Sequence, residues 1–263
     1  WDNITGMATP LTQHVPIQTC GHYESVFVHP DLSIAMGIEV DSLGIGMAVG
    51  NPCILPGPSE PQLRLRKGYL PITEGEWRVD AMTLRQTALC MLLDGSTISE
   101  KGDETQCVCV RLTITNNTDT AIEKPFSLLI GEMGGRQNTN YHPFTASAAR
   151  WMGPPMDLSL SDGLVCLGGH PFMAYRSNIP LDASLPPHPL AMGSDASAPV
   201  AFPNSVRFDV RLEPHTSVVL DLTVAANAIL PNPEDAPFLQ SVRFDEALQR
   251  VETACDALLA KGA

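Results

Sequence analysis

The sequence has 263 residues, of which 44% are hydrophobic, so it can bury a substantial core. Acidic residues outnumber basic residues by 29 to 16, and the net charge of −13 would repel a phosphate backbone. No basic cluster offsets this charge, so nucleic-acid binding is not expected. No apolar run reaches the roughly 18 to 20 residues that a membrane-spanning helix needs, and we expect a soluble protein.

Short strands are predicted along most of the chain. The 23 prolines and 20 glycines are spread throughout and divide the sequence into many short segments, which is typical of turn-rich β architectures. Apolar or alternating runs predict strands at 25–28, 33–40, 44–49, 63–65, 76–93, 158–160 and 164–167. The irregular stretch 177–199 is interpreted as a long surface loop within one domain, with an interdomain linker as the alternative.

Two segments predict β-hairpins. Apolar and polar residues alternate over 108–115 and again over 126–130, on either side of the turn-forming stretch 116–120. The same order of strand, turn and strand appears over 206–224. Each segment predicts two neighbouring antiparallel strands with one face toward the core, and together the strands predict two stacked antiparallel sheets.

The C-terminal segment predicts an amphipathic helix over 244–262. Apolar residues recur there at three- and four-residue spacing, Asp245 and Glu246 lie near its start and Lys261 near its end, which suits the helix dipole. The apolar stripe must pack against something, either the sheet or a further domain. The predicted fold class is therefore mainly β, a two-sheet antiparallel β-sandwich with a C-terminal amphipathic helix.

The seven cysteines indicate a reducing compartment. They are odd in number and lie mostly in strand-like runs, which suits buried free thiols. The sequence starts at Trp1 with no visible signal peptide, so we expect a cytoplasmic protein. Cys107 and Cys109 would share one side of a strand, as a chelating pair might, but without a second pair nearby ordinary burial is favoured. The seven histidines are scattered and no nucleotide motif is present, so neither a metal nor a cofactor is expected.

The loop 131–144 is the candidate ligand site. It collects hydrogen-bonding side chains and an aromatic ring, as sugar-contacting loops do: Glu132, Arg136, Asn138, Asn140, Tyr141 and His142. The alternative is a solvated turn around Gly134 and Gly135. The three tryptophans, Trp1, Trp77 and Trp151, could stack on sugar rings, although a core or interface position is the commoner role. Catalytic carboxylates cannot be selected from 29 acids, because a pair is recognised by its spacing in space.

Four runs in this order resemble a known family: KGYLPITEGEWRVDAMTLRQTALCMLLDG (67–95), VCVRLTITNNTDTA (108–121), VRFDVRLEPHTSVVLDLTV (206–224) and FDEALQRVETACDALLAKG (244–262). They are similar to the amino-terminal portion of bacterial six-hairpin glycosidase-like proteins. The resemblance covers most of the chain from about residue 60 and rests on patterns of strands and turns. It implies a β-supersandwich over 1–240 and a linker helix over 241–263 that leads toward an α/α barrel of helical hairpins, in the same or a separate chain. The family's catalytic carboxylates usually lie in the barrel, so the resemblance implies none here.

The resemblance implies an accessory domain of a carbohydrate-active enzyme, a non-catalytic part of a glycoside hydrolase. Its expected partners are the barrel domain and a glycan ligand. This hypothesis predicts an exposed apolar patch around the terminal helix. The alternatives are a freestanding carbohydrate-binding module, or a structural protein that assembles through the helix.

Overall fold

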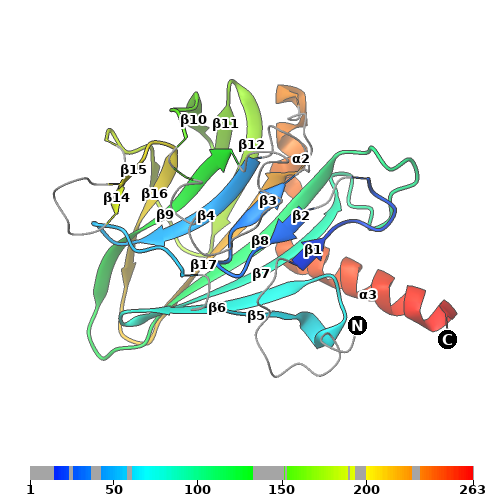
Figure 1. Cartoon of the computed structure of the whole chain (residues 1–263), viewed down its shortest axis with the longest axis horizontal. Coiled ribbons are helices and arrows are strands. Elements are labelled where there is room, and N and C mark those ends of the chain that lie inside the picture. Colours follow the sequence, from blue (N-terminus) through cyan, green and yellow to red (C-terminus); the bar gives the residue numbers. More distant parts are fainter. Residues whose placement is uncertain are drawn as a thin grey trace.

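The computed structural model describes residues 15–23, 26–36, 43–57, 61–132, 151, 153–188, 190–192, 200–226 and 232–262. Its strands form two large antiparallel sheets that pack face to face, which confirms the predicted fold class (Figure 1). The terminal helix also lies where the sequence predicts it. Among the residues that the structure describes, no helix is both long and apolar enough to cross a membrane.

The first sheet has seven strands in the order β1-β2-β3-β4-β9-β16-β13. They are β1 (Val15–Ile17), β2 (Val26–Val28), β3 (Ile34–Met36), β4 (Leu43–Val49), β9 (Ile122–Glu132), β13 (Ala183–Ser184) and β16 (Ser205–Leu212). The second sheet has eight strands in the order β10-β11-β12-β17-β8-β7-β6-β5. They are β5 (Gln62–Leu65), β6 (Thr73–Val79), β7 (Met82–Leu92), β8 (Gln106–Asn116), β10 (Leu158–Ser161), β11 (Leu164–Leu167), β12 (His170–Ser177) and β17 (Ser217–Ala225).

The remaining elements are short, apart from one helix. They are a two-stranded sheet of β14 (Leu190–Met192) and β15 (Val200–Phe202), the 3-10 turns η1 (Arg66–Gly68) and η4 (Pro233–Asp235), and the helices α2 (Ala236–Ser241) and α3 (Phe244–Gly262). The predicted strand 76–93 is in fact two strands, β6 and β7. They are separated by a tight turn in which Asp80 adopts a positive φ of 50°, a conformation that Asp tolerates better than most residues.

Both predicted hairpins are wrong, because each pair of consecutive strands divides between the two sheets. β8 pairs with β7 and β17 in the second sheet, whereas β9 pairs with β4 and β16 in the first. The connections β8–β9 and β16–β17 therefore cross from sheet to sheet at the same end of the sandwich. The buried Asn116 joins these crossings, since its Nδ2 donates to the backbone oxygens of Leu212 and Glu213, each at 3.2 Å. This amide satisfies backbone carbonyls at the corner and fixes the two crossings together.

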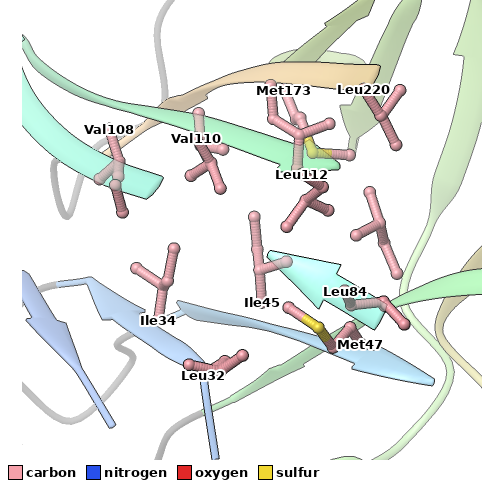
Figure 2. Packing of buried hydrophobic residues seen from close by; sticks show 14 of the residues in the cluster. Leu32, Ile34, Ile45, Met47, Leu84, Val108, Val110, Leu112, Met173 and Leu220 are labelled. Atoms are coloured by element: carbon pink, nitrogen blue, oxygen red, sulfur yellow. The ribbon is translucent and has the colours of Figure 1, made fainter. Parts of the chain in front are cut away.

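The core lies between the inner faces of the two sheets. Figure 2 shows side chains of the first-sheet side approaching those of the second, and all of those labelled are buried: Leu32, Ile34, Ile45, Met47, Leu84, Val108, Val110, Leu112, Met173 and Leu220. The period of two in these strands places alternate residues in this layer and sends the others to the outer faces. The outer face of the second sheet therefore needs its own cover wherever it is apolar.

Helix α3 provides that cover. Its residues Phe244, Ala247 and Val251 pack with Leu239 of α2 in a second apolar cluster against the outer face of the sheet. In the strands this cluster includes Leu89, Met91, Cys107 and Cys109. Toward its end the helix extends beyond the strands (red in Figure 1), and the leucines there are not covered by the sheet. The sheet thus buries only the first half of the apolar stripe.

Candidate functional site

The predicted ligand loop lies almost wholly outside the described residues. Glu132 is the last residue of β9, but its side chain is not described. The other five predicted residues, Arg136, Asn138, Asn140, Tyr141 and His142, lie outside the described ranges. The ligand role of this loop therefore stays a prediction.

Two of the three tryptophans are core residues. Trp77 is 1% exposed and Trp151 is 2% exposed, so neither ring can offer a face to a sugar. Trp151 packs directly on Gly46 of β4, where a Cβ would lie 2.4 Å from Cζ2 of the indole ring. The core role weighed for these tryptophans is thus confirmed for both, and Trp1 lies outside the described residues.

The cysteines are unpaired thiols, as predicted, and four of them are buried, whereas Cys166 and Cys255 are partly buried and Cys20 is exposed. Cys107 and Cys109 do share one face of β8, where both are buried in the cluster beneath α3. A hydrogen bond with Cys107, together with burial, raises the pKa of the Cys109 thiol well above its usual value. No three His, Cys, Asp or Glu side chains in the described ranges converge as metal ligands.

Ser99 and Glu104, in the connection between β7 and β8, form a hydrogen-bonded cluster with His22. The Ser99 hydroxyl donates to Oε2 of Glu104, and His22 Nε2 lies 2.7 Å from the backbone oxygen of Glu104. The Glu104 carboxylate also accepts the backbone N–H groups of Glu100 at 3.0 Å and Lys101 at 2.9 Å. The serine hydroxyl and these N–H groups lower the pKa of Glu104 to about 2. These hydrogen bonds stabilise the connection between β7 and β8.

A groove of about 360 Å³ opens on the outer face of the second sheet, between β12, β17 and α2. Its polar lining includes Arg176 of β12, Asp221 and Thr223 of β17, and Gln240 of α2. Asp162 and Gly163, in the turn between β10 and β11, also line it. Ala174, Leu239 and Phe244 add apolar surface. This volume lies at the lower end of the range of roughly 300 to 1,000 Å³ that is typical of small-molecule sites.

Strand register brings the polar side chains of the groove together. Asp221 of β17 stands opposite Arg111 of β8 on one side and opposite Arg176 of β12 on the other. Two residues further along β17, Thr223 stands between Cys109 and Ala174. Because side chains two apart on a strand share a face, Asp221 and Thr223 both point to the outer face, beneath α2 and the start of α3.

Arg111 joins the sheet to α3 through two carboxylates. Its Nε and Nη2 donate to Oδ1 and Oδ2 of Asp221 at 2.7 and 2.8 Å, and its Nη1 and Nη2 donate to Oδ1 and Oδ2 of Asp245 at 2.6 and 3.1 Å. The guanidinium carbon also lies 4.4 Å from the centre of the Phe244 ring. The hydrogen bond to Asp221 raises the pKa of Arg111, and the hydrogen bond from Arg111 lowers the pKa of Asp245. This network fixes Phe244 as one wall of the groove.

Arg176 forms no ion pair with any carboxylate in the part of the chain that the structure describes. Its Nη2 donates to the backbone oxygen of Gln240 at 2.9 Å, and Gln240 Nε2 donates to the backbone oxygen of Asp162 at 2.7 Å, which closes one end of the groove. The other N–H groups of Arg176 bond to no described residue. The hydroxyl of Thr223, a residue that is only 7% exposed, likewise has no partner among the described residues.

A second concavity of about 460 Å³ on the same outer face is less suited to a ligand. Its charged side chains already pair with one another. Arg64 lies 2.9 Å from Glu74, and Arg85 lies 2.9 Å from Glu76. The hydrogen bond from Arg85 lowers the pKa of Glu76. A ligand there would have to displace existing ion pairs.

The groove is therefore the best-formed candidate site in the described part of the chain. It combines unused guanidinium donors, a hydroxyl and a carboxylate with apolar side chains, an arrangement that can bind and orient a small polar molecule. Sequence reasoning missed it, because its residues come from strands that are far apart in the sequence. A comparison of the sequence with protein-family models gives no match, and neither does a comparison with curated proteins.

Proposed function

We propose that this chain is an accessory β-sandwich domain of a carbohydrate-active enzyme, without catalytic turnover of its own. It would pack through the end of α3 against an α/α-barrel catalytic domain, in the same or a separate chain. The resemblance in the sequence to six-hairpin glycosidase-like proteins supports this proposal, because a two-sheet sandwich followed by a 19-residue helix is the arrangement that the resemblance implies.

The observation that carries the proposal is the incomplete burial of α3. Phe244, near the start of the stripe, is 5% exposed, whereas Leu258 and Leu259 are 42% and 55% exposed. An amphipathic helix normally buries its apolar stripe along its whole length. Adjacent exposed leucines at one end of such a stripe are typical of a surface that another domain covers.

The end of α3 is held in place before it leaves the sheet, which suits a docking element. Glu252 pairs with Arg66 of η1, and Asp256 accepts hydrogen bonds from Lys67 Nζ at 3.2 Å and from the Tyr69 hydroxyl at 3.0 Å. The exposed leucines therefore sit on a helix with a fixed direction. A fixed element loses little conformational entropy when a partner covers it.

The first test is the coding sequence that follows the Ala263 codon, together with activity. We expect an open frame of several hundred codons with repeated helical-hairpin patterns, and hydrolysis of a chromogenic glycoside by the longer protein. The chain of 263 residues alone should give no turnover. Turnover by this chain alone would overturn the accessory role.

A double substitution tests whether another domain covers the exposed leucines of α3. In the longer protein, the double change Leu258→Ser and Leu259→Ser should lower the midpoint of thermal unfolding, since covered apolar area would be lost. The matched control is Gln249→Ser, on the exposed face of the same helix. If the chain of 263 residues dimerises by itself and the double change abolishes the dimer, assembly through the helix replaces the proposed docking.

The second candidate function is a freestanding carbohydrate-binding module. The observation that favours it is the groove at β12 and β17, which has unused hydrogen-bonding groups and is large enough for a small ligand. A stop codon directly after Ala263, combined with saturable sugar binding, would favour this function over the accessory role.

A further inference from the structure

We propose that the groove between β12, β17 and α2 binds a neutral polyhydroxylated ligand, a single sugar ring or the terminal ring of a short glycan. The groove lies at the start of α3, whereas the exposed leucines lie at its other end. The ligand site and the docking surface are therefore separate surfaces, and either proposal can fail without the other.

The mixture of donors and acceptors is the first argument. Arg176 offers unused N–H donors, Thr223 offers a hydroxyl that can donate or accept, and the Asp221 oxygens each accept one hydrogen bond from Arg111 and can accept another. Neighbouring hydroxyls on a sugar ring are donors and acceptors at once. A vicinal diol could therefore bond to the guanidinium of Arg176 and the carboxylate of Asp221 together, as their places in one cross-strand row allow.

The charge balance of the groove favours a neutral ligand. Arg176 brings one positive charge that lacks a described ion-pair partner, but Asp221 stands next to it in the row and Asp162 also lines the groove. The charge of Arg111 is shared between Asp221 and Asp245. A carboxylate ligand would gain one guanidinium but would be repelled by the carboxylate of Asp221, which Arg111 holds in place, and by the negative charge of Asp162, whereas a neutral polyol would meet no such repulsion.

Burial strengthens the polar contacts, and apolar surface completes the site. Thr223 is 7% exposed, so its hydroxyl lies at the bottom of the groove, where a hydrogen bond is less weakened by competing water. Ala174, Leu239 and Phe244 provide carbon surface against which the C–H face of a sugar ring could pack. The volume of about 360 Å³ limits the ligand to a small molecule.

The test is a titration of the isotope-labelled chain with four probes, D-glucose, D-galactose, D-mannose and D-glucuronate, followed by amide chemical shifts. We expect saturable shifts of Gly163 and Thr223 in the millimolar range with at least one neutral sugar. Thr223→Val removes the hydroxyl at nearly constant shape and should weaken this sugar about tenfold. Thr113→Val is the matched control, because Thr113 lies on the same face of the sheet outside the groove, and it should leave the affinity unchanged.

Three outcomes would overturn the inference. The first is the absence of saturable shifts with every neutral sugar. The second is equal weakening by Thr223→Val and Thr113→Val, which would place the binding elsewhere. The third is tighter binding of D-glucuronate than of any neutral sugar, which would make the groove an anion site centred on Arg176. Circular dichroism spectra of both variants check that each variant is folded.

Discussion

The two halves of α3 should respond very differently to the loss of apolar side chains. Val251 is 5% exposed and packs in the cluster against the second sheet, whereas Leu259 is 55% exposed. Val251→Ala removes two buried methyl groups, worth roughly 0.8 kcal/mol each, and the cavity left behind brings the expected loss of unfolding free energy to about 2 kcal/mol. Leu259→Ala should change the unfolding free energy by less than about 0.5 kcal/mol, as exposed substitutions do.

The assay is urea unfolding of the isolated chain, followed by circular dichroism. The midpoint should fall for Val251→Ala at an unchanged slope, so that the difference in midpoint reports stability. Gln249→Ala, on the exposed face of the same helix, controls for changes in helix propensity. Equal losses at Val251 and Leu259, or a loss below about 0.5 kcal/mol at Val251, would show that the helix is not held by the sheet as described.

Three further predictions concern buried or paired polar groups. Gln86 is 2% exposed and its Nε2 bonds to no described residue, so Gln86→Met should raise the unfolding free energy by about 1 kcal/mol in the same urea assay. Arg111→Met leaves Asp221 without its bidentate partner and should lower the unfolding free energy by about 2 kcal/mol, less than for a fully buried pair. Hydrogen bonds from basic side chains lower the pKa values of Asp245 and Asp256, so their contribution to stability is full above the unfolded pKa of about 3.9 and is lost as pH falls through the folded values. An acid titration should therefore show loss of helical ellipticity below about pH 4 that Asp245→Asn reduces.

Local signals explain why the terminal helix could be predicted. The spacing of apolar residues and the charges at both ends lie within one short segment, and the predicted range 244–262 matches α3 (Phe244–Gly262). The strand periods were equally local, and they placed most strands of the two sheets. Some missed strands are short, such as β1 (Val15–Ile17) and β13 (Ala183–Ser184), where two or three residues carry no usable period. The eight-residue strand β12 was also missed, because four successive buried residues, 171–174, hide its period of two.

Pairing is not local, and the hairpin predictions failed for that reason. Alternation over 108–115 and 126–130 requires each strand to turn one face to the core, and a hairpin and a crossing between two sheets satisfy this requirement equally. The deciding feature is Asn116, whose buried amide bonds to the backbone of the β16–β17 connection almost a hundred residues away. A turn-forming residue at this place in the sequence gives no sign of which distant carbonyls it will reach.

The candidate groove shows the same limit. Arg111, Arg176 and Asp221 align in one row only because β8, β17 and β12 are neighbours in the sheet, and no short motif joins these three positions. Asp221 and Thr223 could be assigned to the outer face from the strand period. That the outer face there is hollowed depends on where α2 and α3 lie, which is a property of the packed molecule.

Helix α3 is common to both proposed surfaces, and this gives a way to separate them. Phe244 forms one wall of the groove, and Leu259 lies fifteen residues further on, about 22 Å along the helix. A change at Leu259 should therefore leave sugar affinity unchanged, because the intervening contacts at Val251 still hold the helix on the sheet. Val251→Ala should weaken sugar binding, since loosening the first half of α3 frees Phe244 from its place over Arg111. Both affinities are measured by amide shift titrations of the Leu259 and Val251→Ala variants with the same sugar. If the two variants bind the sugar with equal affinity, α3 does not shape the groove.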